Sequence, residues 1–552
     1  MGKIENINIH IINNKTDISV KKGTTLLEIS KIYNNDMHKR LLLAKLDNVE
    51  RGLNYEVKND CVVEFLDITS SFGFLVYQRS ATFIMMAAIA KVLGDDAVTW
   101  VEHSLNYNLY CNIENVSITD NLLNEINTEM RNIINAKLPI EKMVVSVNEG
   151  IKLLNTKKLI HRKKSLNFVK SSNITIYKLG DYYDYFYGIM VPDASYIEIF
   201  ALHKHGDGFM LQFEDKSNPN NLSQYKAYPK LTGVFKEYKN WIKILGVHTV
   251  GSLNESICNG NIKDLVLLSE ALHEKNIAKI ADKIYSEGKK IVLIAGPSSS
   301  GKTTFSNRLS IQLKVLGLKP SIISLDDYYK NRNEIAVDEN GQQDFENIDS
   351  LDVERFNNDL LNLINGDTVE TALFDFVTGM RKSKGKLIKL EDKGILVIEG
   401  IHGINEELTH KIPKDEKFKI YISPLTQLNI DEHNRISTVD TRLLRRIVRD
   451  HYFRGFGARV TIDMWNKVLN GERKNIFPYQ EEADVMFNSA LIYELGILKI
   501  YAEPLLFSID NTENGYTEAK RLLNFLNSFI AIPPESVPMN SLLREFIGGS
   551  CF

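Results

Sequence analysis

Cysteine is scarce in this chain, with four in 552 residues: Cys61, Cys111, Cys258 and Cys551. None stands in a CxxC pair or in zinc-finger spacing, which excludes a disulfide framework and favours a reducing, cytoplasmic setting. An excess of charge of one sign is also missing, since the formal net charge is −3. The chain therefore has no global basic field that would hold nucleic acid nonspecifically.

Long hydrophobic runs are missing as well. The most apolar segment, residues 81–93, is about 13 residues long, whereas a membrane-spanning helix needs about 20. The N-terminus has no apolar stretch typical of a secretory signal, and Asn6 breaks the myristoylation pattern that the initial Met-Gly would begin. We therefore expect residues 81–93 to form a buried helix, and we expect no membrane association.

The length predicts three or four domains at roughly 100–200 residues each. Residues 1–68 combine short alternating strands with one helix, which indicates a ubiquitin-like α+β module. Residues 69–235 mix helical and strand patterns, with a hairpin turn expected at residues 205–208. Residues 236–288 read as a helical connector. From residue 289 to residue 552, strands alternate with helices, which predicts an α/β domain with a doubly wound parallel sheet.

The strongest local signal is GPSSSGKT at residues 296–303, which matches GxxxxGK[ST] after a buried strand and before a helix. Small residues let backbone N–H groups curl around a phosphate, and the helix adds the positive end of its dipole. A chance Gly/Ser turn is the alternative, and the strand–loop–helix context argues against it. The pattern predicts ATP and Mg²⁺ as ligands, with Lys302 on the β- and γ-phosphates and Thr303 on the metal. The predicted nucleotide-binding residues are Gly296, Ser298, Ser299, Ser300, Gly301, Lys302, Thr303 and Thr304.

Carboxylates follow two of the later predicted strands. Asp326 and Asp327 come at the end of SIISLDD, and Glu399 ends ILVIEG. Functional groups of a doubly wound sheet gather at the carboxyl ends of its strands. Asp326 could take a proton from an attacking hydroxyl and, with Glu399 and Thr303, hold Mg²⁺. The alternative for both positions is an ordinary turn or helix cap after a strand.

A cluster of arginines lies in residues 441–454. Their spacing of i, i+3, i+4 and i+7 puts four on one helical face, which suits a lid that neutralises charge during phosphoryl transfer. Two alternatives are a solvated basic helix paired with acidic neighbours, and a nucleic-acid patch flanked by Tyr452, Phe453 and Phe456. The arginines are Arg442, Arg445, Arg446, Arg449 and Arg454.

Taken together, GPSSSGKTT, SLDDYY, DFENIDSLD, LFDFVTGMR, ILVIEGIHG, DTRLLRRIVRDHYFRG and ADVMFNSA resemble the uridine kinase branch of the uridine kinase and phosphoribulokinase family. The segments occur in family order over roughly residues 289–490. The resemblance implies phosphorylation of a ribose 5′-hydroxyl, with Asp326 as general base. It also implies that Lys302 and Arg449 are catalytic, that Arg446 and Arg454 contact ATP, and that Glu346 binds the ribose hydroxyls. The implied acceptor-side residues are Glu346, Phe374, Asp375, Arg381 and Arg446.

The sequence departs from this family where the nucleobase is read. Phe374 replaces a Tyr, Gly379 replaces a His, and Phe456 replaces the second Arg of an RGR element. A site that loses hydrogen-bonding groups loses the specificity they gave. A sugar or another small alcohol therefore remains an alternative acceptor to a nucleoside.

The N-terminal half resembles threonyl-tRNA synthetase: residues 1–68 look like its TGS module, and residues 69–235 look like its second additional domain. That domain has an editing site with an HSxxH pair, a Cys and a His. Arg79, Phe83, Phe186 and Met190 stand at those four positions and cannot form a metal site. We expect this scaffold to serve binding, regulation or assembly. His203 and His205, two residues apart, could bind metal but are more simply an exposed pair.

The interpretation that follows is an ATP- and Mg²⁺-dependent nucleoside kinase. Its expected partner is a small-molecule nucleoside. Related kinases form tetramers, so a homo-oligomer is one possibility, but the extra N-terminal domains could block that assembly. A nucleotide-sensing protein that binds RNA is the alternative from another class. The last segment, residues 540–552, reads as a short docking helix, and its Gly548-Gly549-Ser550 could cover a site.

Overall fold

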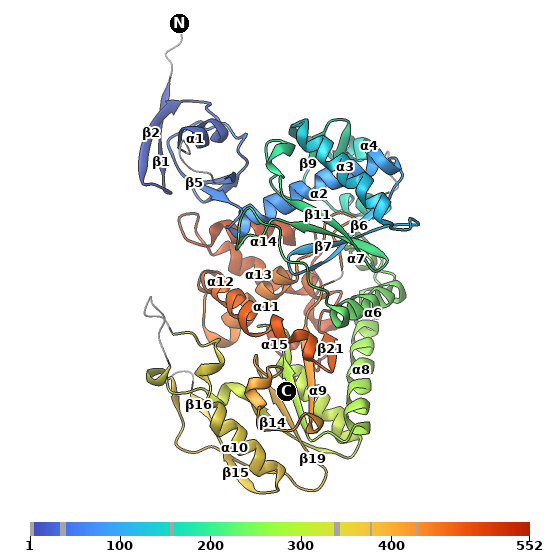
Figure 1. The fold of residues 1–552 in the computed structure, drawn as a ribbon, viewed down its shortest axis with the longest axis vertical. Helices are drawn as coiled ribbons and strands as arrows, with labels where there is room; N and C mark the ends of the chain where they lie inside the picture. Colours follow the sequence, from blue (N-terminus) through green and yellow to red (C-terminus); the bar gives the residue numbers. More distant parts are fainter. Residues whose placement is uncertain (1–4, 34–39, 155–158, 336–342, 376–377, 427) are drawn as a thin grey trace.

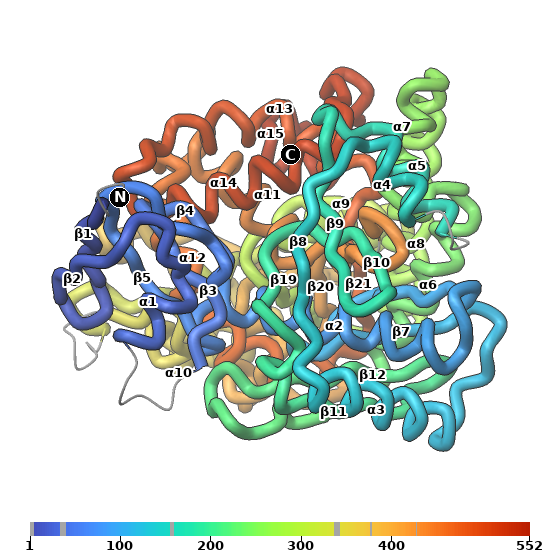
Figure 2. The backbone as a smooth tube through the Cα atoms, turned by 90° about the horizontal axis from the view of Figure 1, so that it is seen from above, coloured from blue at the N-terminus to red at the C-terminus, as the bar shows by residue number. Residues whose placement is uncertain are grey.

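The computed structural model describes residues 5–33, 40–154, 159–335, 343–375, 378–426 and 428–552. Figure 1 shows two small units side by side at one end of the molecule and a larger sheet at the other. The helices of the C-terminal third, in orange and red, lie between them. The same arrangement seen from above shows the N-terminal sheet beside α14 (Figure 2).

The first unit is a five-stranded mixed sheet in the order β2-β1-β5-β3-β4. β1 and β5 run parallel and the other pairs are antiparallel. Apolar residues alternate along β1, so Ile7, Ile9 and Ile11 face the core against the helix α1. This unit thus combines one sheet with one helix, in the α+β class. Its elements are β1 (Asn6–Ile11), β2 (Thr16–Lys21), α1 (Leu26–Tyr33), β3 (Leu41–Leu46), β4 (Val49–Arg51) and β5 (Cys61–Asp67).

The second unit is built around α2, which spans Ser71–Leu93 and begins at the cap Ser70, whose Oγ accepts from the N–H of Gly73 at 2.9 Å. The helix is 23 residues long, longer than the apolar segment 81–93 suggested. By length and composition it could cross a membrane, but 83% of its apolar window is buried in the protein. Its length and apolar character are therefore explained by its position in the core, where it packs against α3 and shares one apolar cluster with residues of the sheet β11-β12-β7-β6.

The predicted hairpin at residues 205–208 is confirmed, because β11 ends at His205 and pairs antiparallel with β12 from Gly208. A second, three-stranded sheet has the order β10-β9-β8. The elements of this unit are β6 (Thr99–Leu105), β7 (Asn108–Ile113), α3 (Asp120–Asn135), β8 (Ile140–Ser146), α4 (Val147–Leu154), α5 (Ile160–Leu166), β9 (Asn173–Leu179), β10 (Tyr182–Asp184), β11 (Phe200–His205) and β12 (Gly208–Phe213).

The predicted helical stretch follows as α6 (Pro229–Leu245), α7 (Val250–Cys258) and α8 (Ile262–Ser286). The larger sheet comes next. It is fully parallel, in the order β14-β19-β13-β20-β21. β13 is buried along its whole length, as expected for the centre of a parallel sheet with helices on both faces. The predicted α/β P-loop fold of the C-terminal half is therefore confirmed.

The strands of the parallel sheet are β13 (Ile291–Ala295), β14 (Lys319–Ser324), β19 (Gly394–Glu399), β20 (Lys417–Ser423) and β21 (Val485–Asn488). Two small antiparallel ladders accompany it. One pairs β15 (Thr368–Thr371) with β18 (Lys386–Lys389), and the other pairs β16 (Phe374–Asp375) with β17 (Met380–Arg381). Its α-helices are α9 (Lys302–Val315), α10 (Val353–Ile364), α11 (Thr438–Arg454), α12 (Ala458–Asn475), α13 (Glu494–Phe507), α14 (Tyr516–Leu526) and α15 (Arg544–Ile547).

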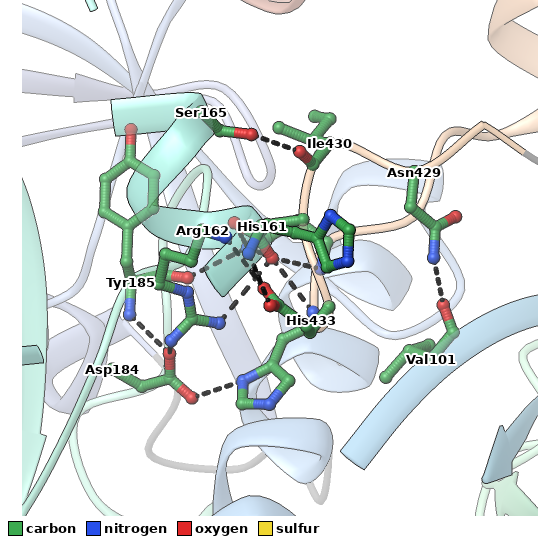
Figure 3. Close-up of polar contacts among 12 residues, drawn as sticks. Val101, His161, Arg162, Ser165, Asp184, Tyr185, Asn429, Ile430 and His433 are labelled. Carbon is green, nitrogen blue, oxygen red and sulfur yellow. Dashed lines mark hydrogen bonds and ion pairs between the residues drawn. The ribbon is translucent and has the colours of Figure 1, made fainter. Parts of the chain in front are cut away.

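A buried polar network joins the second unit to the loop between β20 and α11 (Figure 3). The Arg162 guanidinium is ion-paired with Asp184, and His433 contacts the other oxygen of that carboxylate at 2.7 Å. The carboxylate of Glu432 accepts from the backbone N–H groups of His161 and Arg162, each at 2.9 Å. Because these groups are buried and charged, the loop is held in one position against the second unit.

Candidate active site

The segment 296–301 forms the predicted loop between β13 and α9. A Cβ added at Gly296 would lie 2.0 Å from the carbonyl oxygen of Ile422, so only glycine fits there. Ser299 and Gly301 have φ angles of 61° and 88°, which curl the chain so that consecutive N–H groups point inward. Lys302 bends back over this loop, and its Nζ donates to the carbonyls of Gly296 and Pro297 at 3.0 and 3.3 Å. The geometry is that of an anion-binding cradle at a helix N-terminus.

Two carboxylates that sequence patterns did not reveal accept hydrogen bonds from the cradle. Glu472 in α12 accepts from the N–H of Ser298 at 2.8 Å. Glu545 in α15 accepts from the N–H of Thr304 at 3.0 Å. The C-terminal segment contacts this site through Glu545 and through Leu542, which lies against Gly301, and these are other residues than the predicted Gly548-Gly549-Ser550. Two N–H groups assigned to phosphate binding are thus already bound to carboxylates of the chain itself.

The predicted acidic residues meet at the carboxyl end of the sheet. Ser324, the last residue of β14, pairs with Glu399, the last residue of β19. Asp326 follows in a short 3-10 turn, Leu325–Tyr328, and its side chain is exposed. The surrounding protein still removes part of its hydration, which raises the pKa of Asp326, whereas Lys302, Arg454 and Arg449 act to lower it. A carboxylate whose pKa is raised toward neutrality is a better acceptor for a hydroxyl proton.

Glu399 is the residue best placed to accept a divalent cation with Thr303. The Thr303 hydroxyl donates to Glu399 Oε1 at 3.4 Å. Burial, together with the nearby charges of Asp326 and Glu545, raises the pKa of Glu399 to about 7, against the opposing effect of Lys302. Among the described residues, no group of three or more His, Cys, Asp or Glu is arranged as a metal site. Oxygen donors that carry excess negative charge fit Mg²⁺, which usually binds one or two carboxylates plus substrate phosphates.

The five arginines of α11 divide into two groups, which corrects the expectation of a single lid face. Arg442 and Arg445 are buried, and their guanidinium groups form ion pairs with Glu472 and Glu494. They also donate to the carbonyls of Ser298 and Ser299. These two arginines hold the loop and are part of the core. They pair with acidic neighbours, as the alternative of a solvated basic helix has it, but they are buried and not solvated.

The other three arginines of α11 are not fully buried. Arg446, Arg449 and Arg454 all form ion pairs with the buried Asp450, at 3.2, 2.8 and 3.8 Å. Arg446 also donates to Ser298 Oγ at 2.8 Å. Three cations that share one carboxylate leave an excess of positive charge beside the loop, as a polyphosphate site requires.

The implied acceptor-side residues occupy different environments. Burial and the nearby Glu472 raise the pKa of Glu346 to about 7, and Arg446 and Lys302 oppose this shift, so Glu346 lies near the loop. Arg381 is instead tied to the fold, because it donates to Asp352 at 2.9 Å and to the Tyr329 carbonyl at 2.8 Å.

Phe374 is buried against Tyr329, with a ring separation of 5.7 Å. Asp375 accepts a hydrogen bond from the N–H of Thr378 at 3.3 Å. His402, which sequence reasoning missed, is 1% exposed near Glu346, and burial lowers its pKa to about 4. The sequence signal that could have identified His402 is its position three residues after Glu399, at the carboxyl end of a strand.

The four positions that correspond to the synthetase metal site have lost that geometry as well as its ligands. Phe83 and Phe186 pack edge to face at 5.7 Å, and Met190 joins the same core. Arg79 donates to the carbonyl of Ile189 at 2.5 Å. His205 on β11 contacts the hydroxyl of Tyr225 at 2.5 Å.

Comparison with known proteins gives two separate likenesses. Residues 291–493 match the Phosphoribulokinase / Uridine kinase family. A uridine kinase of Macrococcus caseolyticus is 29% identical over 197 residues, which is 36% of this chain and 86% of that protein. A crystal structure described as a possible uridine kinase from Bacillus stearothermophilus is 18% identical, with a TM-score of 0.27, and covers 39% of this chain and 98% of its own.

The second likeness is to threonine–tRNA ligases. That of Clostridium kluyveri is 23% identical over 236 residues, which is 42% of this chain and 36% of the ligase. The chain therefore spans about a third of the length of that relative. Taken together, residues 291–493 match the Phosphoribulokinase / Uridine kinase family, in a chain that is also similar to threonine–tRNA ligases.

Proposed function

We propose that this protein is an ATP-dependent kinase that transfers the γ-phosphoryl group to the 5′-hydroxyl of a nucleoside of the uridine or cytidine type. The observation that carries the proposal is the placement of Asp326 beside Lys302 and Glu399, at the end of the sheet that also bears the phosphate-binding loop. A loop that only bound a nucleotide would have no use for a carboxylate positioned to accept a proton.

In the proposed reaction, Asp326 accepts the proton of the acceptor hydroxyl as its oxygen attacks the γ-phosphorus. The bond from the γ-phosphorus to the bridging oxygen breaks, and ADP leaves. Lys302, Arg446 and Arg449 hold the phosphates and offset the charge that spreads over the transferring group. Thr303 and Glu399 would hold Mg²⁺, which supplies positive charge to the phosphate oxygens when it is bound.

The assignment of domains along the chain is part of the same proposal. Residues 1–68 form a TGS-like module, and residues 69–235 form a synthetase-like domain without its metal site. Residues 236–288 connect these to the kinase domain of residues 289–552. The similarity to threonine–tRNA ligases and the α+β elements of the first two segments support this division.

The experiment measures ADP release by the purified protein with Mg·ATP against nucleosides, deoxynucleosides and small sugars. Stimulation by uridine or cytidine is the expected result. Phe374 is buried and carries no polar group toward an acceptor, which favours a sugar or another small alcohol as the second candidate. If one of those stimulates ADP release, the assigned substrate changes and the mechanism stays the same. If no compound of the panel stimulates ADP release while the protein binds ATP, the proposal is refuted.

A matched pair of variants tests the base. Asp326→Asn is expected to lower kcat by about 10²- to 10⁴-fold, the usual range for a general base, while ATP affinity changes little. Asp327→Asn is the control, because its carboxylate already accepts from the N–H of Phe374 at 3.4 Å. If Asp326→Asn turns over as the wild type does, the role given to Asp326 is wrong.

A further inference from the structure

A cavity of about 950 Å³ lies between the first two units and the segments 430–440 and 517–528, and among the described residues that line it there is none of the phosphate-binding loop. Its walls come from β4, from α2, from the loop that follows β10, from the segment that precedes α11, and from α14. The network of Figure 3 borders it, since Ser165, Ile430 and His433 belong to both. Its volume lies within the range of small-molecule sites, about 300–1,000 Å³.

The charges in the cavity wall are unbalanced. Two carboxylates, Glu50 and Asp440, face a larger number of basic side chains. Asp440 is already bound by Arg521 through both oxygens, at 2.7 and 2.8 Å. Glu50 therefore remains as the one carboxylate of the wall for the other cations. The basic residues of the wall are Arg51, Arg79, Lys170, Arg435, Lys520 and Arg521.

Arg435 shows the imbalance most clearly. Its Nη1 donates to the carbonyl of Ile436 at 3.3 Å, and among the described residues no carboxylate lies within ion-pair distance of it. Burial lowers the pKa of Arg435 to about 10, with Asp440 as the opposing charge. Charged groups that are removed from water are normally paired with an opposite charge. A half-buried guanidinium in a cavity wall without a carboxylate partner is therefore available to bind an anionic ligand.

Arg79 is a second cation of the cavity wall that is held in place by the backbone. Its Nη1 donates to the carbonyl of Ile189 at 2.5 Å, and a Cβ added at Gly188 would come within 2.7 Å of its guanidinium carbon. The start of α11 also borders the cavity, through its cap Ser437 and through Asp440. The N–H of Asp440 donates to the carbonyl of Ser437 at 3.1 Å, so Arg435 is the group of this region that lacks an anionic partner among the described residues.

The rest of the wall indicates what else the ligand carries. Phe168, Phe186 and Tyr187 line the cavity, and aromatic faces beside guanidinium groups suit a planar ring joined to an anion. We propose that this cavity binds a small organic phosphate of nucleotide size, with its phosphate at Arg435 and its planar body among the aromatic rings.

The test uses the full chain and a fluorescent N-methylanthraniloyl AMP as probe, in a Lys302→Ala background that disables the phosphate-binding loop. Saturable binding is expected, and adding Arg435→Gln should weaken it by about tenfold or more, as loss of a charge-assisted hydrogen bond does. Arg459→Gln on α12 is the control, since it removes an equal charge from outside the cavity and leaves binding unchanged. Lys170→Glu, at an exposed position of the wall, should also weaken binding and is useful if Arg435→Gln folds poorly.

Competing ligands identify the chemistry. Unlabelled AMP should displace the probe at far lower concentration than inorganic phosphate, because phosphate lacks the planar body. Three results would overturn the proposal. The first is the lack of saturable probe binding in the Lys302→Ala protein. The second is a probe affinity that neither Arg435→Gln nor Lys170→Glu changes. The third is a preference for an oligoribonucleotide that AMP cannot displace.

Discussion

The carboxylate of Glu545 accepts a hydrogen bond from a backbone N–H that the phosphate-binding loop would otherwise offer to a nucleotide. Its Oε2 lies 3.0 Å from the nitrogen of Thr304, and its charge also acts on Glu399. ATP must displace this carboxylate to use the full loop. We therefore expect Glu545→Gln to bind Mg·ATP more tightly than the wild type does.

Gln at this position can still accept a hydrogen bond but carries no negative charge, so the magnitude follows from the charge-assisted bond that is lost. A hydrogen bond to a charged group contributes about 1.5–3 kcal/mol. Glu545 is only half-buried, so solvent weakens the bond and about 1.5 kcal/mol is the appropriate end of the range. Since 1.4 kcal/mol corresponds to tenfold in an equilibrium constant, the Kd for Mg·ATP should fall by about tenfold. Removing a negative charge near the triphosphate acts in the same direction.

Titration calorimetry of Mg·ATP into both proteins measures this change, with Glu535→Gln as the control from an exposed position in the same C-terminal segment. Without nucleotide, Glu545→Gln should also have a lower Tm, because a carboxylate at the N-terminus of α9 acts as a helix cap worth about 1 kcal/mol. If the Tm falls while the Kd for ATP stays the same or rises, Glu545 is only a cap and does not compete with phosphate.

Three other perturbations test further parts of the structure. Arg442→Ala should lower the free energy of unfolding by about 3–5 kcal/mol, because it leaves Glu472 buried without its partner. Arg449→Ala should lower the free energy of unfolding less, since Asp450 keeps its ion pair with Arg446, but it should lower kcat by about 100-fold. Urea unfolding measures the effect on stability and steady-state rates measure the effect on kcat. A larger loss of stability in Arg449→Ala than in Arg442→Ala would refute the division of the α11 arginines into two groups. Gly296→Ala should abolish ATP binding in calorimetry while Gly317→Ala, at an open turn, should not, because only at Gly296 does the added Cβ meet backbone, at 2.0 Å. Burial lowers the pKa of His273 from 6.5 to about 3. As pH falls through that range, the unfolded chain takes up the proton first, so the folded state loses stability. Between pH 7 and 4 the urea midpoint should therefore fall less for His273→Gln than for the wild type, and an equal fall in both proteins would contradict this assignment.

Local patterns predicted the parts of the molecule that depend on neighbouring residues. The loop at 296–303 and the hairpin at 205–208 are fixed by small residues and by strand periodicity within a dozen positions. The apolar segment 81–93 was predicted as a buried helix, but its full extent from Ser71 was not. The first three turns of α2 include Gly73, Gln78 and Arg79, which interrupt the apolar pattern. Contacts with distant segments, such as the hydrogen bond from Gln78 to the carbonyl of Tyr107, keep these turns helical.

The parts that could not be predicted depend on residues far apart in the sequence. Glu472 and Glu545 bind the phosphate loop from 174 and 241 positions away, and no local pattern in α12 or α15 reveals this. Helical spacing gave Arg442, Arg445, Arg446 and Arg449 one face, but it could not say which of them would meet a buried carboxylate. The partners Glu472 and Glu494 decide that, and they are known only once α12 and α13 are in place.

α11 also explains how two distant sites in this chain can influence each other. Its N-terminus borders the cavity that holds Arg435, and its C-terminal half carries Arg446 and Arg449 to the loop. A helix of 17 residues spans about 25 Å. Hydrogen bonds from Arg442 and Arg445 to the carbonyls of Ser298 and Ser299 attach its middle to the loop. A ligand in the cavity can therefore change nucleotide affinity only by favouring one position of this helix over another. By linkage, ATP at the loop must then change the affinity of the cavity by the same factor.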